Sequence, residues 1–161
     1  MFEEEKNKKP VVFSLEKIKH WCAYQERCQE EVRQKLIAFK LPGEEIEQII
    51  SSLIVEGYLN EERFAKSFVR GKFTIKHWGK LKIKSALKGK KIPEKLISEA
   101  LKEIDSDLYF LSLSQLLEKK SNVLKEKNKV KKKYILLQYA YSKGYEQDLI
   151  MAALNEMEPS D

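Results

Sequence analysis

One apolar pattern occurs three times in the chain, and this repetition constrains the fold more than any other feature. Shifting six positions of the first copy by 51 residues, and then by a further 53, reaches an apolar or aromatic residue every time. Repeats of this size each have a thin core, so neighbouring copies are stable when they stack. The three copies are Val32, Leu36, Leu41, Ile46, Ile50 and Leu53; Ile83, Leu87, Ile92, Ile97, Leu101 and Ile104; and Leu136, Ala140, Tyr145, Ile150, Leu154 and Met157.

The spacing within each copy is that of helices, because apolar residues recur three, four and seven positions apart. The chain has only six glycines and four prolines, which argues against an architecture of strands and turns. The sequence therefore predicts an all-α protein of three tandem three-helix repeats stacked into an elongated, curved array. The expected boundaries are a flexible tail at 1–13 and repeats at 14–56, 57–105 and 106–161.

Residues that typically begin or end helices predict the bounds of several of them. Ser14 and Cys28 precede the first two helical patterns, and Gly57 can take the positive φ that ends the third. Asn60 can cap a helix over 61–74. The third repeat is expected to begin near Ser106 and to pass through a lysine-rich turn at 125–133, with its first apolar face formed by Leu108, Leu113, Leu116 and Leu117.

Positive charge gathers in two blocks within a chain whose net charge is +6. Residues 63–91 hold eleven Lys or Arg and no Asp or Glu, and residues 119–133 hold eight basic side chains and one acidic. Helical spacing places these cations on faces away from the core, where they could follow a phosphate backbone or simply form a solvated surface. The candidate side chains for binding a partner or DNA are Arg63, Lys66, Arg70, Lys72, Lys76, Lys80, Lys84 and Lys88.

Trp78 lies among these cations, beside Gly79. An indole in this setting can stack on a base or a partner, or it can cover the core as a packing lid. The packing lid is the more common role for a tryptophan beside a glycine turn.

Signatures of catalysis and metal binding are missing from the sequence. It has no phosphate-binding loop, no nucleophile elbow and no zinc-protease motif, and the glutamate pairs fall at helix starts. We therefore predict no catalytic residues, no cofactor and a protein that is not an enzyme. His20, Cys22 and Cys28 do not have the spacing of a zinc site, so we expect two reduced, partly buried thiols and no metal.

The absence of an 18-residue apolar window and of a signal-like N-terminus predicts a cytoplasmic protein without a membrane partner.

Residues 57–65, Gly-Tyr-Leu-Asn-Glu-Glu-Arg-Phe-Ala, resemble the G-Y-L-[ND]-D-x-R-[FY]-A signature of the RecX family of bacterial recombination regulators. The matching signature residues are Gly57, Tyr58, Leu59, Arg63 and Phe64. A later segment, Trp78-Gly79-Lys80 followed by Ile83, Leu87 and Ile92, is similar to that family's G-x-x-x-[IV]-x-x-x-L-x-x-[KR]-G-[IV] segment. Lys91 occupies the position of its usual second glycine.

The resemblance implies a non-enzymatic modulator of RecA. Members of that family bind the RecA filament on DNA, lodge in its helical groove, and restrain its ATP hydrolysis, strand exchange and co-protease activity. The implied roles are in homologous recombination, DNA repair and the SOS response. The implied partners are the RecA filament and single- or double-stranded DNA, with the chain acting as a monomer. The residues leave one alternative open, a helical DNA-binding protein that acts on nucleic acid without a recombinase.

Overall fold

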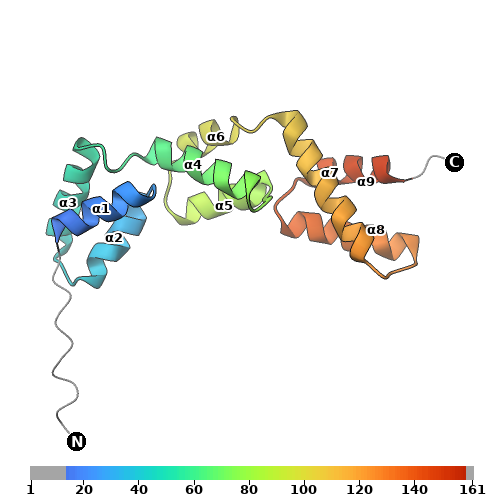
Figure 1. Ribbon diagram of the computed structural model, residues 1–161, viewed down its shortest axis with the longest axis horizontal. Helices are drawn as coiled ribbons and strands as arrows, with labels where there is room; N and C mark the ends of the chain where they lie inside the picture. Colours follow the sequence, from blue (N-terminus) through green and yellow to red (C-terminus); the bar gives the residue numbers. More distant parts are fainter. Residues whose placement is uncertain (1–13, 159–161) are drawn as a thin grey trace, which may run out of the picture. The chain divides into compact units, whose positions relative to one another are not determined.

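The computed structural model describes residues 14–158, and within this range every regular element is a helix. This confirms the predicted all-α class. The helices, labelled in Figure 1, are α1 (Leu15–Tyr24), α2 (Gln29–Ala38), α3 (Gly43–Val55), α4 (Glu61–Thr74), α5 (Lys80–Gly89), α6 (Glu94–Leu101), α7 (Ser106–Val123), α8 (Lys129–Ser142) and α9 (Gln147–Met157). We refer to α1–α3, α4–α6 and α7–α9 as the first, second and third triplets.

The chain divides into two compact units, the first ending at Phe64 and the second beginning at Ala65. The division therefore falls in the first turns of α4. The predicted repeat boundaries at 14–56, 57–105 and 106–161 stay a prediction, and the predicted tail at 1–13 lies outside the described residues. The first unit packs around one core, formed by Ile18, Cys22, Val32, Leu36, Ile46, Ile50, Leu53 and Leu59.

The repeated apolar positions form the cores of the triplets. All eighteen are buried except Leu41, Leu101 and Met157, which are half-buried. Leu36, Leu87 and Ala140, which are equivalent under the two shifts, are each 0% exposed. In the third triplet α7, α8 and α9 all pack against one another, as Figure 1 shows.

The same backbone feature ends the second helix of each triplet. Lys40, Lys91 and Gly144 have φ of 59°, 61° and 95°, so all three are left-handed. Each donates its N–H to the carbonyl three residues earlier, at 2.8, 2.9 and 2.9 Å. These residues are again separated by 51 and 53 positions. The repeat therefore extends to the turn geometry, although two of the three turns carry lysine where glycine would be least strained.

The apolar face of α7 matches the prediction only in part. Leu113 and Leu117 are buried as predicted and Leu116 is half-buried, whereas Leu108 is 57% exposed and Tyr109 lies in the core in its place. Asp105 Oδ1 caps the helix by accepting from the N–H of Leu108 at 2.9 Å, and Tyr109 can enter the core because its hydroxyl is hydrogen-bonded there to Lys80 and Glu146.

The start of α8 also differs, because part of the expected lysine-rich turn at 125–133 is helical. The helix begins at Lys129, and Asn128 caps it by accepting from the N–H of Lys131 at 3.1 Å. Lysine is a good helix former, so a run of lysines after a capping residue extends a helix.

Within the second unit, a close backbone contact joins α5 to the loop after α8. The N–H of Gly79 donates to the carbonyl of Lys143 at 2.7 Å, and the N–H of Leu81 donates to the carbonyl of Gly144 at 2.9 Å. A Cβ at Gly79 would lie 2.3 Å from the Gly144 backbone, and one at Gly144 would lie 2.3 Å from Lys82 Cβ. Only glycine at both positions permits this approach.

Two buried tyrosines complete this joint between the second and third triplets. The Tyr109 hydroxyl accepts from the N–H of Lys80 at 2.9 Å and donates to Glu146 Oε1 at 2.7 Å. The Tyr145 hydroxyl donates to the carbonyl of His77 at 3.0 Å, and the two rings lie 5.1 Å apart. Burial is the main cause that raises the pKa of both phenols, so both stay protonated at neutral pH.

Candidate binding surface

The signature residues at 57–64 complete the first unit. Gly57 has φ of 83°, which reverses the chain after α3. Leu59 and Phe64 are buried, and Tyr58 packs half-buried against the core. These positions are explained by folding alone, without a bound partner.

Arg63, a predicted binding residue, is engaged within the same unit. Its Nε forms an ion pair with Glu26, and its Nη2 donates to the carbonyl of Gly57 at 3.0 Å. A second donation reaches the carbonyl of Tyr58 at 3.5 Å. These contacts support a role in holding the signature loop, and a role for Arg63 in binding stays a prediction.

Three of the predicted cations in the second unit already have partners within that unit. Lys66 pairs with Glu103 at 3.5 Å, and Lys84 pairs with Glu94 at 3.8 Å. Lys80 Nζ lies 4.8 Å from the centre of the Tyr109 ring. Exposed ion pairs contribute only about 0–1 kcal/mol, so a polyanion can compete for Lys66 and Lys84.

Arg70, Lys76 and Lys88 are exposed, and among the described residues their side chains form no ion pair. Arg70 lies on α4, Lys88 lies on α5, and Lys76 follows α4 in the loop. A ligand can therefore bind these three cations without first breaking an ion pair.

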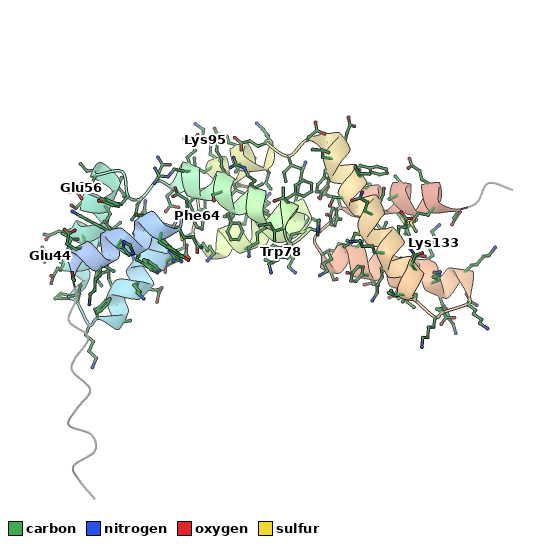
Figure 2. All side chains as sticks on the ribbon, in the orientation of Figure 1. Glu44, Glu56, Phe64, Trp78, Lys95 and Lys133 are labelled. Carbon is green, nitrogen blue, oxygen red and sulfur yellow. The ribbon has the colours of Figure 1, made fainter. Side chains whose placement is uncertain are left out.

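Two lysines lie over the ring of Trp78. Lys72 Nζ and Lys82 Nζ lie 4.7 and 4.5 Å from the centre of its ring. Trp78 is half-buried beside the start of α5, where Figure 2 labels it. Lys72 is one of the predicted binding residues, whereas Lys82 is not, because Lys82 lies off the line of Lys80, Lys84 and Lys88. Its position four residues after an aromatic was the signal that could have identified it.

A cavity lined by lysines lies in the third triplet. It has a volume of about 460 Å³ and is lined by Lys129, Lys132 and Lys133 over Leu136 and Leu154. Lys133, labelled in Figure 2, pairs with Glu158 at 3.0 Å. This cavity belongs to the second block of positive charge predicted from the sequence.

The two cysteines lie in surroundings typical of structural thiols. Cys22 and Cys28 are free and buried, as predicted. Burial raises the pKa of the Cys28 thiol to about 11, so the reactive thiolate is scarce at neutral pH. Among residues 14–158, His, Cys, Asp and Glu side chains form no group of three or more that could hold a metal ion.

None of the helices in the described part of the chain has both the length and the apolar character needed to cross a bilayer.

Comparison with known proteins identifies the family. The family model described as "RecX, second three-helix domain" matches residues 60–101. The Regulatory protein RecX of Pelodictyon phaeoclathratiforme is 32% identical over 125 residues, which cover 78% of this chain and 76% of that protein. The chain belongs to the RecX family. The family resemblance drawn from residues 57–65 is thereby confirmed.

Other RecX proteins extend the comparison. The Regulatory protein RecX of Clostridium perfringens (strain SM101 / Type A) is 32% identical over 124 residues, covering 76% of this chain and 58% of that protein. The relative from Bacillus mycoides is 25% identical, with 51% of its length covered. The chain thus spans between half and three-fifths of the length of these two relatives.

Solved RecX structures share the fold. The crystal structure of RecX from Lactobacillus salivarius is similar with a TM-score of 0.79 at 26% identity, over 89% of this chain and 93% of that one. A second RecX crystal structure has a TM-score of 0.80 at 20% identity, over 88% and 70% of the two chains, and supports the fold alone.

Proposed function

We propose that the chain is a non-enzymatic cytoplasmic regulator that binds the RecA filament assembled on DNA. Binding restrains the filament's ATP hydrolysis, strand exchange and co-protease activity, and so modulates DNA repair and the SOS response. Membership of the RecX family supports this proposal, since its curated relatives carry the name of regulatory proteins. The observation that carries it is the acid-free run of cations at 63–91, from which Arg70, Lys76 and Lys88 project without ion-pair partners among the described residues.

A filament on DNA presents the polyanion that such a surface requires. Exposed cations raise the rate of encounter with a polyanion and release its counterions on contact. The three exposed cations are therefore proposed to approach the DNA or an acidic part of the filament. The other predicted cations of the second unit are proposed to join them by exchanging their present ion pairs and ring contacts for contacts with the polyanion. They are Lys66, Lys72, Lys80 and Lys84.

The decisive variant replaces Arg70, Lys76 and Lys88 by Gln. Glutamine keeps the helix propensity near that of lysine, so the fold should survive. RecA ATPase on single-stranded DNA should be restrained less by this variant than by the parent chain. Each lost phosphate contact should flatten the salt dependence of binding by roughly 0.7, giving about two units for all three.

A matched control removes three positive charges elsewhere, with Lys17, Lys95 and Lys102 replaced by Gln. These lysines are also exposed, so the net charge changes equally. Equal restraint by both triple variants and by the parent chain would show that the run at 63–91 is a solvated face.

The alternative function, direct action on nucleic acid without a recombinase, predicts a different result. Such a protein should bind naked DNA at physiological salt as tightly as it binds DNA coated with RecA. The proposed regulator should bind more tightly when RecA is present.

A further inference from the structure

The second unit contains an open groove between α5 and the end of α8. Its volume is about 440 Å³, within the range of roughly 300–1,000 Å³ typical of small-ligand sites. Leu81 and Tyr141 are 44% and 56% exposed in it. The side chains that matter here are Trp78, Leu81, Lys82, Ser85 and Tyr141.

The joint between the second and third triplets gives this groove a fixed shape. One wall begins at Gly79 and the other ends at Gly144, and the two backbones are hydrogen-bonded at 2.7 and 2.9 Å. The buried Tyr145 hydroxyl also ties the third triplet to the carbonyl of His77, next to Trp78. A ligand therefore meets two aromatic walls that are already in place, which lowers the entropic cost of binding.

The charge of the groove selects an anionic ligand. Among the described residues, none that lines it is acidic, whereas Lys82 lies within it and Lys72 holds its ammonium 4.7 Å from the Trp78 ring. Exposed aromatic faces beside lysines are the arrangement by which proteins bind single-stranded nucleic acid, with bases on the rings and phosphates on the cations.

The magnitudes allow a base to replace the lysines over Trp78. The two cation–π contacts together are worth roughly a factor of five to 30 in affinity, and a base stacked on the ring is worth roughly a factor of five to 150. The displaced Lys72 and Lys82 have flexible stems, so their ammonium groups can move from the ring to the neighbouring phosphates. After the exchange, both ammonium groups remain close to the Trp78 ring, where they can bind the phosphates next to the stacked base.

We propose that this groove binds one segment of single-stranded DNA, with bases against Trp78 and Tyr141 and phosphates on Lys72 and Lys82. The proposal deepens the proposed function and rests on it in one respect, since the strand in the cell would be the DNA of the filament. The binding itself needs no recombinase, so it can be tested on the chain alone.

The test uses the full chain carrying Trp21→Phe, because the sequence has only two tryptophans and Trp78 is the other. The probe is oligothymidylate of roughly 15 nucleotides, within the site size of single-strand binding folds. At low salt, saturable quenching of Trp78 fluorescence is expected. Unchanged fluorescence during saturable binding, or no binding at all, would overturn the proposal.

Variants in the same background sharpen the test. Tyr141→Ala should weaken binding by roughly five- to 150-fold, the loss expected for one stacked base. Replacing Lys72 and Lys82 by Gln should flatten the salt dependence by about 1.4 units. Tyr24→Ala is the matched control, since Tyr24 is an 80% exposed tyrosine in the first unit. Equal effects of Tyr141→Ala and Tyr24→Ala would contradict a site in the groove.

Polyglutamate supplies negative charge without bases, so it separates base recognition from attraction of any acidic chain. It should leave Trp78 fluorescence unchanged, and quenching equal to that by oligothymidylate would refute the groove as a base-binding site.

RecA ATPase separates the two proposals. If the parent chain restrains the ATPase but Trp78 does not respond to DNA, the groove proposal fails and the proposed function stands. If Trp78 responds to DNA but the ATPase is not restrained, the proposed function fails and the groove proposal stands.

Discussion

Lys91 holds a backbone conformation that is strained for lysine and relaxed for glycine. Its φ is 61°, and it lies between α5 and the buried Ile92. Lys91→Gly should raise the free energy of unfolding by about 1 kcal/mol, because a left-handed residue with a Cβ costs roughly 1–2 kcal/mol. Urea unfolding measures the change.

The matched control for this substitution is Lys88→Gly in the same basic segment. Lys88 lies inside α5, where glycine costs roughly 0.5–1 kcal/mol. The two variants should therefore differ in sign. Destabilisation by both would show that Lys91 is not strained.

Glu61 provides a prediction about pH. Burial is the main cause that raises its pKa, while the N–H of Gln29, 3.4 Å from Oε1, acts in the opposite direction. Its other carboxyl oxygen is buried without a hydrogen-bond partner among the described residues. The folded state thus favours the neutral carboxyl, so this contribution to stability is present below the unfolded pKa and is lost as pH rises through the folded pKa.

Glu61→Gln is neutral at every pH and avoids that loss. Its free energy of unfolding, relative to the parent chain, should rise between about pH 4 and pH 7. Denaturant unfolding at both pH values measures the difference. A variant that loses stability relative to the parent over this interval would show that the ionised carboxylate is favoured in the fold.

At the scale of helices, the core position Leu87 tests the helical phase of the second triplet. It is 0% exposed on α5, so Leu87→Ala should cost about 2–5 kcal/mol through lost burial and a cavity. Leu81→Ala on the same helix removes the same atoms from a position that is 44% exposed, and should cost less than about 1 kcal/mol. Similar costs for the two variants would contradict the assigned faces of α5.

The joint between the second and third triplets makes a further prediction. Gly144→Ala places a Cβ 2.3 Å from Lys82 Cβ at a φ of 95°, so it should destabilise by at least about 2 kcal/mol. Gly71→Ala, inside α4 with no atom within 4 Å of the new Cβ, should instead stabilise by about 1 kcal/mol. Thermal unfolding of both variants measures the contrast, and a tolerated alanine at position 144 would argue against the close backbone contact.

The sequence predicts the helices well where an apolar period and a cap agree. Ser14, Gly57 and Asn60 mark helix ends that the structure confirms. The prediction fails at Leu108, because a tyrosine one position later can also enter a core when its hydroxyl finds partners, as Tyr109 does with Lys80 and Glu146. Those partners belong to other helices, and a helical period in one segment contains no information about them.

For the whole molecule, charge composition predicts which segment carries the exposed cations but not how they are arranged. Arg63 belongs to the same run of sequence as Arg70, yet its guanidinium is held by Glu26 and by two carbonyls. Lys72 and Lys82 lie close to Trp78 in the sequence, but Trp78 and Tyr141 are more than sixty positions apart and line the same groove only in the folded chain. Helical spacing within one segment cannot specify that arrangement.

The decisive test of whether this member of the RecX family restrains RecA is the RecA ATPase rate on single-stranded DNA. The chain is added at substoichiometric ratios to filaments that are already hydrolysing ATP. The proposed function predicts a fall in the ATPase rate that is weakened by replacing Arg70, Lys76 and Lys88 with Gln and unchanged by replacing Lys17, Lys95 and Lys102. An ATPase rate that stays constant up to equimolar addition of the folded parent chain would contradict it.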